Sequence, residues 1–366
     1  TYRIRLTCDQ EPTVSVESLD FSIGGMYYVN DDSLEGDVFC TAVGDDGLNA
    51  GKSTNAPKAS IQAILDAYDL EPGDTVYVDS GIYPTPGGVV VEEFDGGDEG
   101  AYVVFRGPPA PGRAVLVGTG GGSDVMAVRA DWIAIERIAL VSGQRGLHLD
   151  GVWGFIVEGC ALQDNLGEGI YAYESRGQIA NCQITNNRLY GVNVYACSGV
   201  SLLNNTLWHN QYAVYIHSWT CQRPCDVVLS GNILSSEEGG ACIFWSTSRC
   251  ATIIGSEYNC FDTRAGGTVA GGTLGDWRVS TGFDLHSISA DPLFADAANG
   301  DFHLKSTAGR WDPAANGGAG GWVVDEVMSP CIDAGDPAAA VGDEPAPHGG
   351  RINLGAYGGT EEASKS

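Results

Sequence analysis

The chain has little positive charge and almost no lysine. Its 366 residues contain 19 Lys and Arg against 47 Asp and Glu, which gives a formal net charge of −28. Lysine is absent between Lys58 and Lys305. A general nucleic-acid binder needs a positive field to attract phosphates, so this composition argues against one. No uninterrupted apolar stretch approaches the ~18 residues that span a bilayer, so we expect no membrane span.

The cysteines lack the arrangement of a zinc site. No Cys-x-x-Cys pair or nearby histidine cluster occurs among the 11 cysteines. Cys221 and Cys225 lie close enough in sequence to bridge a local loop, and Cys250 and Cys260 could do the same. We therefore expect an oxidising compartment and several disulfides.

What the chain does contain is glycine and a repeat. There are 52 glycines and only 18% charged residues, which is typical of a turn-rich β protein. Three segments that begin at Gly146, Gly169 and Gly191 share three short apolar runs separated by polar turns. A repeat of 22 or 23 residues with several strands per unit predicts a solenoid, in which each unit buries its apolar face against its neighbours.

The segments before the repeats predict a covered end. Residues 1–25 are polar and weakly patterned, and we expect a linker or a separate N-terminal segment there. Apolar residues at helical spacing predict a short helix over residues 58–69. Such a helix would close the open end of the core and hide the edge of the first coil.

Residues 26–366 are predicted to form one domain of roughly eight to ten coils. After the last regular coil, residues 264–280 form a Gly-rich loop in this prediction, and residues 281–366 form an irregular tail packed on the solenoid. The chain begins with Thr1 rather than Met, which we take to indicate a mature form or a module of a larger chain, most simply a monomer.

Several motifs point to a known fold. GDTVYV follows the predicted helix, the repeats follow it, and the tail contains ADPLFADAANGDFHLKSTAG, SPCIDAGDP and INLGAYGGT. With these features the chain resembles secreted bacterial right-handed parallel β-helix proteins of the pectate-lyase-like superfamily. The resemblance implies an all-β fold with three parallel strands per coil and a secreted or cell-surface location. It leaves the activity open, because the superfamily includes lyases, hydrolases, epimerases and non-catalytic adhesins.

In the resembled fold, the turn after the second strand often carries a ladder of stacked asparagines. Here that position contains Cys160, Cys182, Asn205 and Asn232. Coils stack ~4.8 Å apart, so equivalent side chains fall above one another and their amides can hydrogen-bond along the stack. The two cysteines are most simply buried and inert, with a disulfide between coils as the alternative.

Alternation along the first strand of each coil assigns the faces of the side chains. In GLHLD, Leu147 and Leu149 point inward, so His148 and Asp150 point outward. The same rule predicts two outward columns. One contains His148, Tyr171, Asn193, Tyr215 and Ile243, and the other contains Arg129, Asp150, Tyr173, Tyr195, His217 and Trp245.

This outward strip predicts a polysaccharide-binding groove. Aromatic side chains combine an apolar face with a polar tip, which suits sugar rings. Arginines near the strip suit carboxylate or sulfate groups, so we expect an anionic polysaccharide. The alternatives are aromatic stacking that only stabilises the sheet, and turns in which charges simply gather. The predicted binding residues are Tyr171, Asn193, Tyr215, Trp245, Glu174, Arg145, Arg176 and Arg188.

The chemistry favoured by these residues is β-elimination on a uronate-containing polymer. His217 or His148 could be the base, because its ordinary pKa is near neutral. Tyr195 or Tyr173 could be the acid, and a tyrosine could be the base where an arginine lowers its pKa. Arg145, Arg188 or Asn193 could hold the carboxylate. Related families use Lys or Arg with Ca²⁺, but the regular coils contain no lysine, which favours a His/Tyr variant.

Three alternatives stay open. Asp150 and Glu174 lie on adjacent coils, with Glu168 in the turn before Glu174, and could form the carboxylate pair of an inverting hydrolase. A C5 epimerase or a non-catalytic glycan-binding or stalk module would also fit the fold. Ca²⁺ is possible but uncertain, because Asp333 and Asp336 could either ligate it or form an Asx turn.

Overall fold

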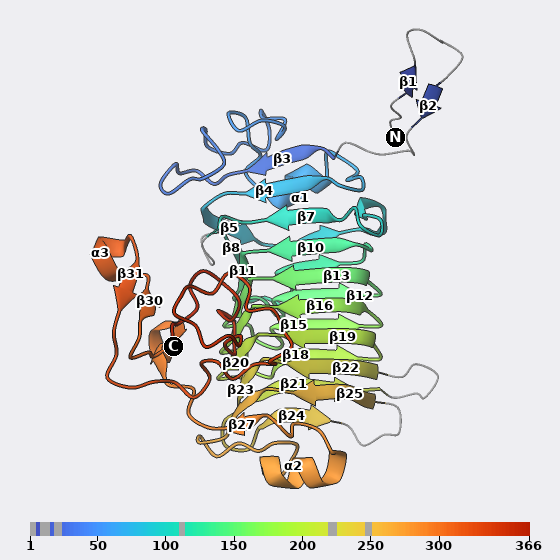
Figure 1. The fold of residues 1–366 in the computed structure, drawn as a ribbon. Coiled ribbons are helices and arrows are strands. Elements are labelled where there is room, and N and C mark those ends of the chain that lie inside the picture. The colour runs from blue at the N-terminus through green and yellow to red at the C-terminus, as the bar shows by residue number, and fades with distance from the viewer. Residues whose placement is uncertain (1–4, 8–14, 18–23, 110–113, 219–224, 246–250) are drawn as a thin grey trace.

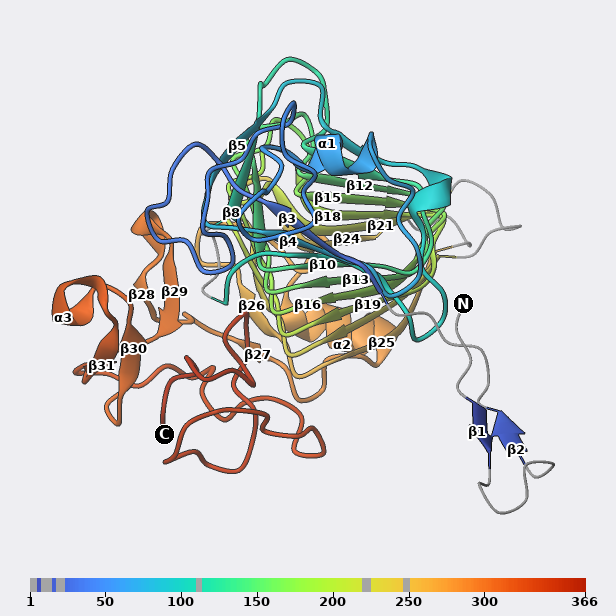
Figure 2. The same cartoon turned by 90° about the horizontal axis from the view of Figure 1, so that it is seen from above.

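Short parallel strands wind around one axis into a solenoid (Figure 1). The computed structural model describes residues 5–7, 15–17, 24–109, 114–218, 225–245 and 251–366. Seen along the axis, the strands form three sheets around a common interior (Figure 2). The predicted all-β parallel β-helix is therefore confirmed.

Each regular coil contributes one strand to each sheet, in the order sheet I, sheet II, sheet III. Sheet I contains β6 (Val89–Val91), β9 (Met126–Val128), β12 (Leu147–Asp150), β15 (Ile170–Tyr173), β18 (Tyr190–Tyr195), β21 (Tyr212–His217) and β24 (Ala241–Trp245). Sheet II contains β3 (Met26–Val29), β4 (Thr75–Val78), β7 (Val103–Arg106), β10 (Ile133–Glu136), β13 (Trp153–Glu158), β16 (Arg176–Ala180), β19 (Ser198–Leu203), β22 (Cys225–Ser230) and β25 (Ala251–Glu257). Sheet III contains β5 (Gly81–Thr85), β8 (Ala114–Gly118), β11 (Ile138–Val141), β14 (Ala161–Gln163), β17 (Gln183–Thr185), β20 (Thr206–Trp208), β23 (Ile233–Ser235), β26 (Cys260–Asp262) and β27 (Ile288–Ser289).

Among the described residues, sheet I has seven strands and sheets II and III have nine each. Seven coils thus have all three strands, fewer than the predicted eight to ten, and sheets II and III each have two further strands. The interior is filled by the inward side chains of every strand. Phe105, Phe155 and Phe261 are among the largest fully buried ones. Each such side chain contributes ~1.5–3 kcal/mol through burial.

The N-terminal end of the core is covered by helix α1 (Ile61–Leu65), as predicted but over fewer residues. Ser60 caps the helix by accepting a hydrogen bond from the Ala63 N–H. Gln62 Oε1 accepts a hydrogen bond from the N–H of Val90 in β6, the first strand of sheet I. The helix therefore satisfies a backbone group at the exposed sheet edge.

The other end is closed by a helix where we predicted a loop. Helix α2 (Leu274–Thr281) begins with a capping box between Thr273 and Asp276. Trp277 is buried against the core, and its indole N–H donates to Asp284. The Thr-x-x-Asp signal was present in the sequence, but the surrounding glycines obscured it.

The tail packs on the solenoid, as predicted, and it does so at sheet III. The Asn181 amide donates to the carbonyls of Ala356 and Gly358, and the Ala356 N–H donates to Thr206. The remaining elements are β28 (Phe294–Asp296), β29 (Asp301–Leu304), β30 (Arg310–Asp312), α3 (Ala315–Gly318), β31 (Gly321–Val323) and the 3₁₀ helices η1 (Glu93–Asp95) and η2 (Ala297–Asn299). Within residues 1–25, β1 (Arg5–Thr7) and β2 (Ser15–Glu17) pair antiparallel. No described helix is long and apolar enough to cross a membrane.

The predicted asparagine ladder is present and extends one coil further. The Asn205 amide donates to Asn232 Oδ1, and Asn232 donates to Asn259 Oδ1, at 3.0 and 3.1 Å. All three side chains are buried. A second ladder, Asn165–Asn187–Asn210, lies in the turn that leads into sheet I. Our reading missed it, although its members are spaced 22 and 23 residues apart.

The predicted disulfides of Cys225 and Cys260 are not formed. The eight described cysteines, including both of these, are buried free thiols. The expected partners Cys221 and Cys250 lie outside the described residues. Cys225 points into the core, and burial raises the pKa of its thiol to about 11. Cys160 and Cys182 also stay reduced, so both serve as small apolar core residues, as expected.

Replacing Asn205 with alanine should destabilise the fold. The substitution leaves the buried Cys182 N–H and the Ile179 carbonyl without the partners that Asn205 provides. Each unsatisfied group costs about 1–3 kcal/mol, so we expect a loss of about 3 kcal/mol in the free energy of unfolding. Urea denaturation measures it. The exposed Asn299→Ala control should change stability by under ~0.5 kcal/mol, and equal effects for the two variants would contradict the ladder's role.

Candidate functional site

Sheet I carries two outward columns of polar and aromatic side chains, as alternation predicted. Strand register aligns the first in the order His148, Tyr171, Asn193, Tyr215, and we call it column 1. It aligns the second in the order Asp150, Tyr173, Tyr195, His217, and we call it column 2. The intervening inward residues of these strands are fully buried.

The prediction was wrong by one residue at β24. Ala241 pairs with Tyr212 and Ile243 with Val214, so Ile243 points inward and is fully buried. Phe244 instead continues column 1 beside Tyr215 and is 41% exposed. Trp245 therefore does not extend column 2. It is partly buried against the core and lies edge-on to Trp277 of α2.

The rings of column 2 stack along the solenoid axis. The ring centroids of Tyr173 and Tyr195 are 5.2 Å apart, and those of Tyr195 and His217 are 4.4 Å apart. These distances match the spacing of neighbouring strands, ~4.8 Å. The stabilising ring stack that we considered as an alternative is thus present. Neighbouring rings occupy each other's faces, so the surface offers ring edges and polar atoms more than flat apolar faces.

His217 is the last residue of β21, and its ring has the shortest centroid distances to neighbouring rings within the two columns. Its ring is sandwiched between Tyr195 and Tyr215, with centroid distances of 4.4 and 4.3 Å and nearly parallel planes. Its Nε2 lies 3.1 Å from Asn193 Oδ1. Burial lowers the pKa of His217 to about 4. At neutral pH it is therefore an uncharged imidazole that can accept a proton.

His148 has a different environment. Its Nδ1 lies 3.1 Å from a carboxylate oxygen of Asp124, in the turn before β9. Burial acts to raise the pKa of Asp124, but the hydrogen bond from His148 and the charge of Arg145 outweigh it and lower the pKa. Our reading missed Asp124. It precedes the first regular repeat, where no repeated motif marked it.

The structure separates the two histidines that we considered as bases. His148 lies on β12 and His217 on β21, three coils further along sheet I. At ~4.8 Å per coil their strands are roughly 14 Å apart. One sugar bond cannot be within reach of both rings. The site around His217 contains Tyr195, Tyr215 and Asn193, and the one around His148 contains Asp124, Arg145 and Tyr171.

Arg145 is neutralised by the protein itself. Its guanidinium lies 3.4 Å from Asp124 and 3.3 Å from Glu168, and it covers the ring of Tyr171 at 4.8 Å. Its charge is thus already compensated, which weakens its predicted role as a carboxylate ligand. Burial raises the pKa of Tyr171 to about 12, although Arg145 acts to lower it. Tyr171 therefore stays protonated at neutral pH, and Arg145 does not make it a base.

The other predicted arginines lie at opposite edges of sheet I. Arg188 is exposed in the turn before β18. Arg176 begins β16 of sheet II, where its guanidinium lies 5.9 Å from the ring centre of Trp153. Asp150 lies at the end of β12, and Glu174 directly follows β15 in a left-handed conformation. Glu174 thus lies one coil further along the solenoid than Asp150.

The described residues contain no group of three or more His, Cys, Asp and Glu side chains placed to hold a metal ion. Asp333 and Asp336, which we considered for Ca²⁺, accept backbone N–H groups of Gly349 and Ala338. His303 is buried between Asp301 and Glu362 in the tail. The contacts of these three side chains are all with other residues of the tail.

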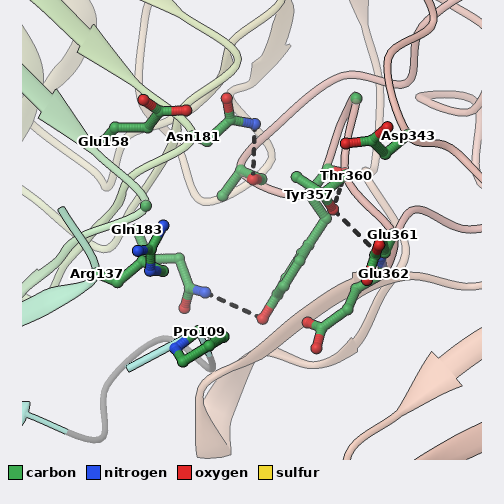
Figure 3. Close-up of a pocket in the computed structure, with 13 residues that line it drawn as sticks. Pro109, Arg137, Glu158, Asn181, Gln183, Asp343, Tyr357, Thr360, Glu361 and Glu362 are labelled. Atoms are coloured by element: carbon green, nitrogen blue, oxygen red, sulfur yellow. Dashed lines mark hydrogen bonds between the residues drawn. The ribbon is translucent and has the colours of Figure 1, made fainter. Parts of the chain in front are cut away.

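A pocket of about 350 Å³ lies elsewhere, between the tail and the turns beside sheet III (Figure 3). Tyr357 projects into it from the tail, and its hydroxyl accepts a hydrogen bond from Gln183 of β17. Arg137 and Glu158 face the same space from the solenoid. The tail thus contributes to a pocket away from sheet I and leaves the two columns uncovered.

Comparisons with known proteins agree with this architecture. The family described as a right-handed β-helix region matches residues 121–272, and a family described as disaggregatase-related matches residues 227–335. No match was found among curated proteins. The solenoid is thus a right-handed parallel β-helix, as predicted.

Several polysaccharide lyases have similar structures. A rhamnogalacturonan lyase has a TM-score of 0.50 at 12% identity, with 65% of this chain and 68% of that chain covered. The pectate lyase Pel9A has a TM-score of 0.49 at 15% identity, with 92% and 96% covered. An alginate lyase from Paenibacillus sp. str. FPU-7 has a TM-score of 0.36 at 12% identity, with 63% and 95% covered. At 12% identity, the likeness to the rhamnogalacturonan lyase shows the fold alone.

Acidification should reveal the lowered pKa of His217. Its folded pKa of about 4 lies below the unfolded value of about 6.5. Between these values the unfolded chain binds a proton that the folded protein does not, so stability falls as the pH drops from 6.5 to 4. His217→Gln should lose less stability than the parent across this window, as measured by urea denaturation. The exposed His286→Gln serves as the control. Parallel curves for the parent and His217→Gln would contradict the shift.

Proposed function

We propose that the chain is a secreted carbohydrate-active protein that cleaves a uronate-containing polysaccharide by β-elimination on sheet I. The observation that carries the proposal is the neutral His217, held between Tyr195 and Tyr215 on an outward strip. A base that is uncharged at neutral pH is the first requirement of this reaction. The similar folds of several lyases are compatible with it.

In the proposed reaction, His217 takes the proton at C5 of the uronate, beside its carboxylate. The electron pair of that C–H bond forms the C4–C5 double bond, and the bond from C4 to the glycosidic oxygen breaks. Tyr195 gives its phenolic proton to the leaving oxygen, which ends the step with two sugar chains. Tyr195 stacks directly on His217, so acid and base approach one sugar from adjacent coils.

The uronate carboxylate needs a positive or hydrogen-donating partner, because neutralising it makes the C5 proton more acidic. Arg145 is already paired with two carboxylates. Arg188, exposed in the turn before β18, lies seven residues or about 20 Å along the strand direction from Tyr195, so it would bind a carboxylate of a neighbouring sugar unit of the same polymer. We propose that Arg188 is the residue that selects an anionic substrate.

An inverting hydrolase remains the second candidate because of Asp150. This residue lines an open pocket of about 560 Å³ together with Asp98 and Asp131, beyond the N-terminal end of column 2. Glu174 directly follows Tyr173, which pairs with Asp150 from the neighbouring coil, and an inverting pair needs its carboxyl groups about 6.5–9.5 Å apart. This reaction would yield reducing ends without an unsaturated sugar.

A panel of acidic polysaccharides, read by ultraviolet absorbance and by reducing ends, tests the proposal. We expect both signals to rise with at least one polymer. His217→Ala and Tyr195→Phe should each lower kcat by at least about 100-fold, since each removes an acid–base group. His286→Ala and Tyr258→Phe, a stacked His/Tyr pair outside sheet I, are the matched controls and should keep full activity.

Reducing ends without ultraviolet absorbance would overturn elimination in favour of hydrolysis. Full elimination activity in both groove variants would move the chemistry away from His217. If Arg188→Ala leaves KM for the acidic polymer unchanged, the assignment of the carboxylate contact is wrong.

A further inference from the structure

His148 and its neighbours form a second polar site on sheet I, three coils before His217. The Nδ1 atom of His148 lies 3.1 Å from Asp124 Oδ2, and the histidine side chain is 22% exposed. Tyr171 lies beside it in the next coil, with 5.1 Å between the ring centroids. Among the residues that the structure describes, Nε2 of His148 has no hydrogen-bond partner. This nitrogen of a partly exposed ring is therefore available to a ligand.

The contact with Asp124 determines which nitrogen of His148 carries the hydrogen. The pKa of Asp124 is lowered despite its burial, so this side chain is a carboxylate at neutral pH. A carboxylate only accepts hydrogen bonds, and Nδ1 of His148 must therefore be the donor. In the uncharged ring this leaves the lone pair on Nε2, which then accepts a hydrogen bond and cannot donate one. A sugar hydroxyl can donate to such a nitrogen, whereas a uronate carboxylate cannot.

The charges beside His148 also disfavour a carboxylate. Asp124 and Glu168 lie 3.4 and 3.3 Å from the guanidinium of Arg145, so two carboxylates share one positive charge. Both carboxylates are largely buried, with side-chain exposures of 14% and 12%. One negative charge is therefore in excess, and it repels the carboxylate of a sugar and suits the hydroxyl donors of a neutral one.

We propose that His148, held by Asp124, selects a neutral sugar unit of the substrate by accepting a hydrogen bond at Nε2 from a hydroxyl group of that unit. Asp124 is the positioning residue, and His148 is the residue that determines specificity. This inference rests on the proposed function, in which a uronate is cleaved at His217. The two sites lie roughly 14 Å apart along sheet I and bind different units of one chain. The substrate class is therefore a polysaccharide that joins uronates to neutral sugars.

The position of the hydrogen is measured on the full chain with ¹⁵N-labelled histidine and long-range ¹⁵N–¹H correlation spectra at neutral pH. We expect the parent to show His148 protonated at Nδ1 alone. Asp124→Ala removes the acceptor and should shift His148 toward the Nε2–H form. A parent ring that is protonated at both nitrogens, or at Nε2 alone, would overturn the inference.

Specificity is measured by elimination of two groups of polymers. Polygalacturonate and alginate contain uronates alone, whereas rhamnogalacturonan and gellan join uronates to neutral sugars. We expect a higher kcat/KM for a polymer of the second group. His148→Ala should raise KM for that polymer about 10-fold with kcat little changed, because it removes one hydrogen bond to the sugar. Asp124→Ala, which turns Nε2 into a donor, should reduce the preference for the second group.

His209→Ala and Glu237→Ala are the matched controls, because Glu237 Oε1 lies 2.8 Å from His209 Nε2 on an exposed surface. Both variants should keep the parent KM. Elimination of uronate homopolymers alone, or an equal rise of KM for both groups in His148→Ala, would overturn the inference while the lyase stands.

Elimination of neither group would make the proposed function wrong. The neutral-sugar site is then decided by binding of rhamnogalacturonan and gellan, measured by calorimetry. His148→Ala should weaken that binding about 10-fold. Equal binding by the parent and His148→Ala, or no binding by the parent, would overturn the inference as well.

Discussion

The structure depends on the parallel backbone register between coils. Each strand pairs with the equivalent strand of the next coil, so residues 22 or 23 apart in sequence lie one strand spacing apart in space. This constraint produces the buried asparagine ladders, the apolar interior and the two outward columns together. Polar side chains that recur at an outward position of successive coils form a surface strip. Polar side chains that recur at a turn form a hydrogen-bonded stack.

The same register explains why the sequence predicted so much. Alternation in GLHLD and in the repeats after it assigns His148, Tyr171, Asn193 and Tyr215 to one face, and the strand register agrees. Alternation assigned the wrong face where the repeat becomes irregular. In β24 three successive residues are buried, Ala241 through Ile243, so alternation no longer identifies the outward side. The capping box of α2 and the carboxylate of Asp124 lie outside the repeated motif altogether.

Long-range partners were the least predictable part of the site. Nothing in the local sequence indicates that Arg145 forms ion pairs with Asp124 and Glu168, because those contacts join three different turns. The predicted disulfides of Cys225 and Cys260 were wrong for a similar reason. Their spacing permits local bridges, whereas the fold places Cys225 and Cys260 in the core as free thiols. Burial decides both outcomes, and burial follows from the assembled coils.

The chemistry that we propose uses the ring stack as a device that controls protonation. Packing His217 between two tyrosines partly removes its ring from water, which lowers its pKa and keeps it uncharged at neutral pH. The stack that stabilises the sheet would thereby also prepare the base. A structural role and a catalytic role for the aromatic residues are compatible in this account.

The most direct measurement is a crystal structure of His217→Ala with a bound acidic oligosaccharide. Our account predicts sugar units lying along sheet I across columns 1 and 2, with one C5 atom facing the space left by the imidazole beside Tyr195. Oligosaccharide bound instead in the tail pocket beside Arg137 and Tyr357, with sheet I empty, would contradict it.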